Sequence, residues 1–229
     1  MKPTGELPMK ILAVEFSSEL RSVALVEKLP DGTSRVRGSA LEKGGRNAHA
    51  FDLVELALQE AKMEREEIDC IAVGIGPGSY TGIRAAIALA QDGHLGHELK
   101  LVGISSVECL AAQTFADGIR GRASFIVDAQ RNEFYLATYE MGENGFSEIE
   151  PLHLATFVEV EKRIAENQLV FGPDVKRLFA KAQDLYPNGE MLGQLASQET
   201  DFVSGEKLEP IYLREVSFVK APPPRVISD

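Results

Sequence analysis

The chain has 229 residues, of which 44% are hydrophobic and 26% charged, as is typical of soluble globular proteins. Its 24 basic and 35 acidic residues give a net charge of −11, which disfavours unaided binding to a nucleic-acid backbone because the phosphates would be repelled on average, so that binding would need a local basic patch or a basic partner. The two cysteines cannot build a disulfide framework, and no apolar stretch approaches the roughly 20 residues that span a membrane. We therefore expect a cytoplasmic protein.

The chain is predicted to begin with a hairpin. Residues 1–8 read as a short disordered extension, and they carry Pro3, Gly5 and Glu6 rather than the apolar core of a signal peptide. Residues 10–17 and 21–28 are apolar runs joined by a short polar turn, which predicts two paired strands, with a third strand following at 34–40. Glu15 and Ser17 lie at the turn. Two interpretations of Glu15 stay open, a carboxylate linked to metal and phosphate or a satisfied strand end.

The next predicted element is a helix at residues 48–62. Its apolar side chains form two adjacent stripes, wider than one sheet contact needs, which favours a second packing partner; they are Phe51, Val54, Leu58 and Ala61, then Leu53, Leu56 and Ala57. His49 stands at the start of this helix, and the residue four positions later is Leu53. A helical pair of histidines that could bind a metal is therefore absent, and we expect no metal site.

A glycine-rich turn follows an apolar strand at residues 71–75. Gly76, Gly78 and Gly82 permit a tight turn, and Ser79 or Thr81 can cap a helix of small residues at 83–91. A strand, a glycine turn and a helix N-terminus can bind an anion. However, no Lys-Ser/Thr pair follows the last glycine, and the spacing differs from the dinucleotide fingerprint. Both a phosphate loop and a purely structural turn remain possible.

The second half repeats the plan of the first. A strand at 99–104 and a helix capped by Ser105 precede two strands at 123–129 and 133–140. Asp128 sits at the turn between these strands, where it either faces a cleft or stabilises the turn. The repeated strand, acidic turn and strand suggest a duplicated lobe. The later pattern predicts helices at 157–166 and 175–184, a strand at 169–171 and a proline-rich tail at 220–229.

The glycine segment also carries a family resemblance. GIGPGSYTGIR, at residues 74–84, closely resembles the GIGPGSFTGLR signature of the bacterial TsaB (YeaZ) family of tRNA threonylcarbamoyladenosine biosynthesis proteins, filed with the glycoprotease-like M22 group. Residues 102–111, 128–135 and 210–214 resemble three further motifs of that family. Glu15 departs from the pattern, since the family usually has Asp-Thr-Ser at that turn.

The resemblance implies an α/β fold of two ribonuclease-H-like lobes, as in the actin/hexokinase/Hsp70 (ASKHA) superfamily. We expect lobes at 9–117 and 118–219, with the second truncated. It also implies a non-catalytic scaffold that binds TsaD, supports recruitment of TsaE and meets tRNA only within that complex. No catalytic residue, metal or cofactor of its own is expected, while ATP or ADP and a divalent metal would belong to the complex.

Two sets of residues follow as candidate sites. The expected interface with TsaD, or between two copies of this chain, comprises His49, Asp52, Leu53, Leu56, Ile83, Ala86 and Ile87. The expected vestigial nucleotide cleft comprises Glu15, Ser17, Gly76, Gly78, Ser79, Thr81, Gly82 and Asp128. Two alternatives remain: a nucleotide-binding ATPase or kinase of the same superfamily, with residues 76–82 as its phosphate loop, and an M22-type peptidase, which the missing histidine pair opposes.

Overall fold

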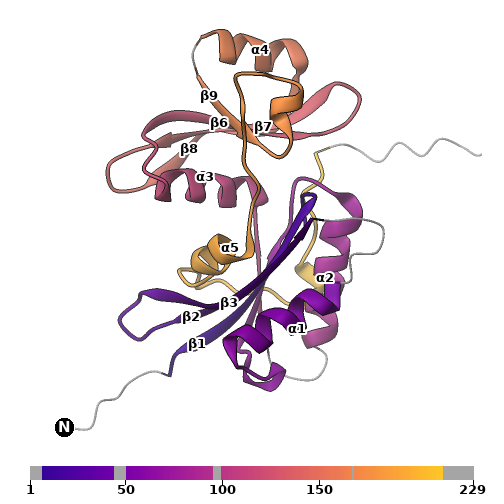
Figure 1. Cartoon of the computed structure of the whole chain (residues 1–229), viewed down its shortest axis with the longest axis vertical. Coiled ribbons are helices and arrows are strands. Elements are labelled where there is room, and N and C mark those ends of the chain that lie inside the picture. Colours follow the sequence, from indigo (N-terminus) through magenta and orange to yellow (C-terminus); the bar gives the residue numbers. More distant parts are fainter. Residues whose placement is uncertain (1–6, 44–49, 95–98, 167, 214–229) are drawn as a thin grey trace, which may run out of the picture.

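The computed structural model describes residues 7–43, 50–94, 99–166 and 168–213. Two lobes, each built on a five-stranded sheet, are stacked along the long axis of the molecule (Figure 1). The predicted extension at 1–8, except for Leu7 and Pro8, and the whole predicted tail at 220–229 lie outside the described residues. None of the helices in the described ranges has the length and apolar character that crossing a bilayer requires.

The first sheet has the strand order β3-β2-β1-β4-β5. β1 pairs antiparallel with β2, β2 pairs antiparallel with β3, and β4 and β5 continue the sheet as parallel strands. The hairpin predicted for the start of the chain is therefore confirmed. The strands of this sheet are β1 (Met9–Glu15), β2 (Leu20–Lys28), β3 (Ser34–Lys43), β4 (Cys70–Gly74) and β5 (Lys100–Ile104).

The second sheet repeats this topology. Its order, β8-β7-β6-β9-β10, matches that of the first when the strands are counted from β6, with the same antiparallel and parallel pairings. The duplication suggested by the two acidic turns is thus visible in the strand order. Its strands are β6 (Gly121–Asp128), β7 (Glu133–Met141), β8 (Phe146–Thr156), β9 (Leu169–Gly172) and β10 (Gln183–Asp184).

The second lobe is shortened at its parallel edge. Where the first lobe has a long helix between its two parallel strands, the second has only the 3-10 turn Val175–Arg177 and then the two-residue strand β10. The helix predicted at 175–184 is wrong. Val175, Phe179 and Ala182 are buried against the sheet, and their spacing is close to that of one helical face. Apolar residues at this spacing are expected on one face of a helix, which explains the wrong prediction.

Helices cover both faces of the first sheet. On β1, Leu12 and Val14 face α1 and α2, whereas Ile11 and Ala13 face α5, which explains why the strand is apolar without alternation. In the second lobe, α3 covers one face and α4 the other. The helices are α1 (Ala50–Ala61), α2 (Tyr80–His94), α3 (Ser106–Ala116), α4 (Phe157–Ala165) and α5 (Gly189–Ala196), with further 3-10 turns at Arg65–Glu67 and Gly205–Lys207.

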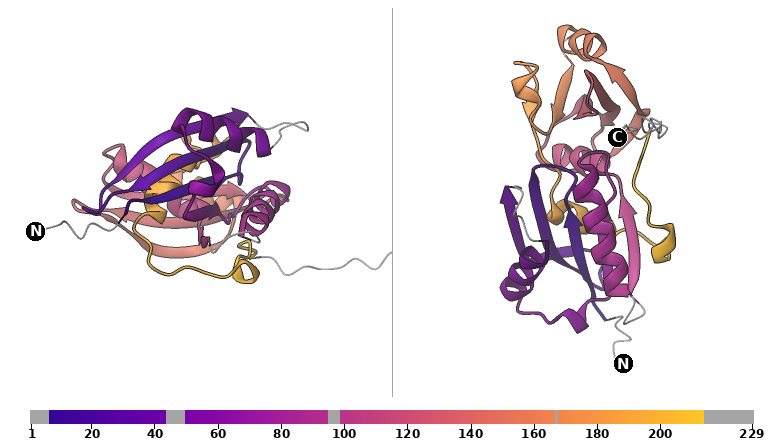
Figure 2. Two further views of the ribbon diagram at one scale, coloured as in Figure 1. Left: turned by 90° about the horizontal axis from the view of Figure 1, so that it is seen from below. Right: turned by 90° about the vertical axis from the view of Figure 1, so that its right-hand side faces the viewer.

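The chain returns to the first lobe after completing the second sheet. α5 packs on β1 and β2, and α3 and α5 lie together between the two sheets (Figures 1 and 2). The backbone N–H of Gly189 donates to the Ser22 hydroxyl at 3.1 Å. The sequence prediction placed all of 118–219 in the second lobe, because an amphipathic helix does not reveal which sheet it covers. The observed packing assigns α5 to the first.

Replacing Leu192 by alanine tests this packing. Leu192 is fully buried against the first sheet, so the substitution removes apolar contacts and leaves a cavity. We expect the free energy of unfolding to fall by about 2–5 kcal/mol in urea titrations. The matched control is Leu178→Ala, because Leu178 is 43% exposed and loses little on truncation. Equal effects of the two substitutions would contradict the assignment of α5 to this core.

Candidate functional site: the interlobe cleft and the loops at its base

The turn between β1 and β2 lies directly on the glycine segment between β4 and α2. A Cβ atom at Gly82 would stand 2.0 Å from the Phe16 carbonyl oxygen, and one at Gly78 would stand 2.1 Å from the Ser17 carbonyl oxygen. Gly78 also has a φ of +154°. The backbone N–H of Ser79 donates to the Ser17 carbonyl at 2.7 Å. The two glycines are therefore required by contact between two backbones, and this supports the structural interpretation of the turn.

The N-terminus of α2 binds atoms of its own chain. The Ser79 hydroxyl accepts a hydrogen bond from the Gly82 N–H at 3.2 Å, and the Ser79 carbonyl accepts one from the Ile83 N–H at 2.9 Å. Ser79 is the cap, whereas Thr81 is exposed. The Ser79 N–H is also engaged, so two of the four amides that the helix start leaves without intrahelical partners, those of Ser79 and Gly82, are already bound. Half of the predicted anion cradle is therefore used by the chain itself.

Glu15 lies beneath these loops and away from the cleft. Its side chain is fully buried, Oε1 accepts from the Ser17 N–H at 2.7 Å, and Oε2 accepts from the Ser106 hydroxyl at 2.8 Å. A Cβ at Gly74 would overlap this carboxyl group, so the glycine makes room for it. Burial raises the pKa of Glu15, and the hydrogen bonds from Ser17 and Ser106 oppose that shift. Glu15 is thus a satisfied group at a strand end.

Above the loops, a cleft of about 600 Å³ lies between the two lobes. Four of the predicted cleft residues line it: Ser17, Gly78, Ser79 and Asp128. The other four, Glu15, Gly76, Thr81 and Gly82, do not. The lining has three carboxylates, of Glu19, Asp128 and Asp174, against two guanidinium groups, of Arg21 and Arg177. Its formal charge of −1 does not favour a phosphate ligand.

Asp128 stabilises the turn between β6 and β7. Its Oδ1 accepts from the Gln130 N–H at 2.7 Å, and its Oδ2 pairs with Arg177 at 3.4 Å. Gln130, Arg131 and Asn132 have φ values of 64°, 60° and 60°, a left-handed run that this side-chain contact supports. The carboxylate is therefore engaged in a structural role at the cleft wall.

The sequence analysis missed two aromatic residues of the cleft. Tyr80 and Tyr212 line it with their ring centroids 5.8 Å apart, and the Arg84 guanidinium lies 5.4 Å from the Tyr80 ring centroid. The Ile211 N–H donates to the Ile75 carbonyl at 2.9 Å, which fixes the last described segment to the glycine loop. Residues 210–214 had been noticed as a motif, but nothing in the sequence indicated that they cross to this loop.

Most of the predicted interface residues lie in the core of the first lobe. Leu53, Ile83, Ala86 and Ile87 are between 0% and 7% exposed and pack against the first sheet. The sequence interpretation assigned too many apolar side chains of α1 and α2 to the surface. Only the side chains that point away from the sheet are exposed on these helices. Those at the surface of α1 include Asp52, Leu56 and, beyond the predicted set, Phe51. His49 is outside the described residues.

The fold and the cleft define a class of protein. Two lobes with the same ribonuclease-H-like strand order, separated by a cleft, are the architecture of the actin/hexokinase/Hsp70 superfamily, as expected. Residues 47–213 match the family described as "TsaD: tRNA N6-adenosine threonylcarbamoyltransferase", and the chain belongs to this family.

Individual relatives agree with this assignment along nearly the whole chain. The tRNA threonylcarbamoyladenosine biosynthesis protein TsaB of Escherichia coli K12 is 28% identical, over 93% of this chain and 99% of the relative. TsaB of Bacillus subtilis 168 is 27% identical, over 90% and 94%. The solved structure of YeaZ from Pseudomonas aeruginosa superimposes with a TM-score of 0.72 at 24% identity, covering 90% of this chain and 100% of that one. The resemblance to TsaB (YeaZ) proteins is confirmed.

The contact at Gly82 can be tested by adding a single methyl group. Gly82→Ala improves helix propensity but drives a Cβ into the Phe16 carbonyl, so we expect a net loss of about 1–3 kcal/mol in the free energy of unfolding. Gly145→Ala is the control, because nothing lies within 4 Å of its added Cβ. A Gly82 variant as stable as the control would show that the loops do not depend on this contact.

The burial of Glu15 predicts a pH-dependent stability. A carboxyl group whose folded pKa is raised stabilises the fold at low pH, and this contribution is lost as the pH rises through the raised value. The isosteric Glu15→Gln variant cannot ionise. We therefore expect the free energy of unfolding of the wild-type protein to fall relative to that of this variant as the pH rises above 4.5, the ordinary value for a glutamate, measured by urea unfolding.

The exposed Glu161→Gln substitution serves as the control for this measurement. Its unfolding free energy should follow that of the wild type across the same pH range. If Glu15→Gln does so as well, the carboxyl group does not pay a burial penalty.

Proposed function

We propose that this chain is a non-catalytic partner subunit in the formation of threonylcarbamoyladenosine in tRNA. Family membership and the names of the full-length relatives support a role in this modification. The state of the cleft is the observation that favours a partner over an enzyme. Glu15 is buried beneath the loops, and two of the amides that would cradle a phosphate, those of Ser79 and Gly82, bind Ser17 and Ser79 instead. The chain then has no catalytic residue or nucleotide of its own in the proposed complex.

The outer face of α1 is the proposed contact with a TsaD-type subunit. Phe51 and Leu56 are 56% and 53% exposed on this helix. Gly38 lets α1 lie against β3, since a Cβ there would stand 2.6 Å from the Ala61 backbone nitrogen, so Phe51 and Leu56 are on the side of the helix that faces away from the sheet. Large exposed apolar side chains are a common feature of protein interfaces.

The rest of the proposed assembly rests on the resemblance to TsaB proteins. The TsaD-type subunit contributes the transferase chemistry and, with it, any ATP or ADP and divalent metal that the reaction uses. A TsaE-type ATPase joins the pair, and tRNA meets the assembly rather than this acidic chain alone. Without a TsaD-type subunit, the same face can pair two copies of this chain. We place the assembly in the cytoplasm.

The decisive experiment is co-purification with the TsaD protein of the same organism, followed by sizing at moderate salt. We expect a stable complex that Leu56→Glu weakens at least tenfold, because a charge would be buried where an apolar contact existed. Leu178→Glu, at an exposed leucine of the second lobe, is the matched control and should leave the complex intact. Ile87→Glu is unsuitable, since Ile87 is 7% exposed and the change would damage the core.

Two results would overturn the proposal. The first is a complex that Leu56→Glu and Leu178→Glu affect equally, which would place the interface elsewhere. The second is the absence of a complex together with ATP turnover by the purified chain. That result would return residues 76–82 to an active role and favour the nucleotide-enzyme alternative.

A further inference from the structure

The last described residues of the chain lie in the interlobe cleft. Ile211 and Tyr212 line it, and the Ile211 N–H donates to the Ile75 carbonyl oxygen at 2.9 Å. The Tyr212 ring lies against the Tyr80 ring, with their centroids 5.8 Å apart. Residues 214–229, which come one position later, are outside the described residues. This segment is therefore attached to the protein at a fixed point in the cleft wall.

Tyrosine rings line both walls of the cleft. Tyr80 and Tyr212 belong to the wall formed by the first lobe, and Tyr135 on β7 belongs to the opposite wall. Tyr80 and Tyr212 are 59% and 45% exposed, so about half of each side chain is open to solvent. Grooves lined by aromatic rings are common binding sites for proline-rich segments, whose polyproline conformation is already formed before binding. The rings of this cleft suit such a segment.

The charges in the cleft favour a basic segment. Three carboxylates, of Glu19, Asp128 and Asp174, outnumber the guanidinium groups of Arg21 and Arg177. Asp128 and Asp174 already accept hydrogen bonds from neighbouring groups. A carboxylate has about four acceptor positions, however, so each can still pair with a further donor.

The undescribed segment has the composition that this lining requires. Residues 218–225 read FVKAPPPR, in which three consecutive prolines stand between Lys220 and Arg225 and an aromatic residue precedes them. Phe218 is five positions after Leu213, and five residues span at most about 17 Å. The segment is thus close enough to its point of attachment, and long enough, to turn back into the cleft.

We propose that residues 218–225 bind in the interlobe cleft of their own chain. The proline rings pack on the tyrosine rings of the two walls, and Lys220 and Arg225 pair with the carboxylates. Attachment at Ile211 gives the segment an effective concentration in the millimolar range, so even a weak contact is populated. The bound segment connects the two lobes and excludes other ligands from the cleft. It leaves the outer face of α1 free, so the inference does not depend on the proposed function.

The absence of tryptophan from the chain permits a test with a single fluorescent reporter. Phe218→Trp in the 229-residue protein should emit at a shorter wavelength than a peptide of residues 214–229 with the same substitution. With millimolar effective concentration, a contact of millimolar affinity is about half formed, so acrylamide should quench the protein at about half the rate of the peptide or less. Replacing Pro222, Pro223 and Pro224 together by serine should abolish this protection.

Variants of the cleft, each made in the Phe218→Trp background, locate the binding site. Tyr80→Ala and Asp174→Asn should each shift the emission toward that of the free peptide. The matched controls are Phe51→Ala and Asp201→Asn, at exposed positions that do not line the cleft, and they should retain the protection. Circular dichroism confirms that each variant is folded.

Three results would overturn the proposal. The first is a reporter as accessible in the protein as in the peptide. The second is protection that the cleft variants and their controls lose equally. The third is protection that falls on dilution of the protein, because the segment would then bind a second copy of the chain rather than its own cleft.

Discussion

The contact between two backbone turns at the base of the cleft organises the first lobe. The carbonyl oxygens of Phe16 and Ser17 occupy the space that side chains would need at Gly82 and Gly78. This close approach sets where α2 begins and how it crosses the sheet. It also uses the Ser79 amide, which a phosphate-binding loop would leave available. The same glycines that resemble a ligand loop in the sequence thus serve the packing of the chain on itself.

A buried carboxyl group supports this contact from below. Glu15 accepts hydrogen bonds from Ser17 in the first turn and from Ser106 at the start of α3. Ser106 in turn receives a hydrogen bond from the Gly76 N–H at 3.2 Å and donates its own N–H to the Gly76 carbonyl at 2.8 Å. One side chain therefore connects β1, the glycine segment and α3. A fully buried acid is tolerated there because both of its oxygens have partners.

The sequence predicted the elements of the fold better than their long-range packing. An unbroken apolar run such as that of β4 predicts a strand covered on both faces. The sequence from Gly74 to Arg84 is specific enough to indicate the family. Burial of one helix face was harder to predict. The pattern of α2 shows an apolar face but not that Ile83 and Ile87 point toward the sheet, and the short α5 does not name the sheet it covers.

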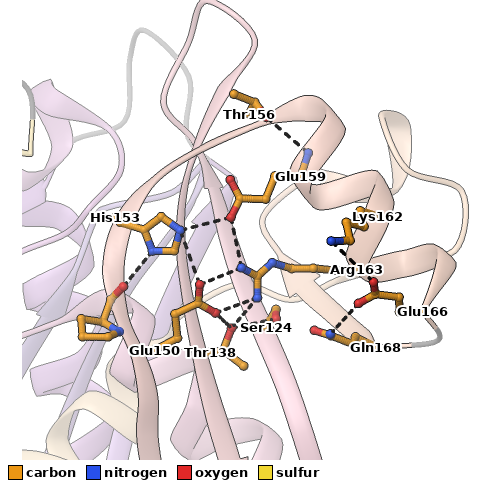
Figure 3. A network of polar contacts seen from close by, with 11 residues as sticks. Ser124, Thr138, Glu150, His153, Thr156, Glu159, Lys162, Arg163, Glu166 and Gln168 are labelled. Carbon is orange, nitrogen blue, oxygen red and sulfur yellow. Dashed lines mark hydrogen bonds and ion pairs between the residues drawn. The ribbon is translucent and has the colours of Figure 1, made fainter.

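The candidate sites show the same limit. Ser17 and Asp128 were expected at the cleft and line it, because acidic and hydroxyl residues after a strand are visible in the sequence. Tyr212 reaches the cleft through a hydrogen bond between residues that are far apart in the chain, which no local pattern records. Glu150, His153, Glu159 and Arg163 form an ion-pair network where β8 meets α4 (Figure 3), and they meet only because these two elements fold back on each other.

The return of α5 to the first sheet has a consequence for how the chain folds. The hydrogen bond between Gly189 of α5 and Ser22 of β2 joins residues that are 167 positions apart in the chain. The second face of the first sheet is therefore covered by α5 only after the second lobe has been synthesised. Until then, the face of β1 and β4 that carries Ile11, Ala13 and Ala72 stays open to solvent. Contacts of such long sequence separation slow folding and leave apolar surface exposed during synthesis. The lobe that is first in the sequence is thus the last to be completed.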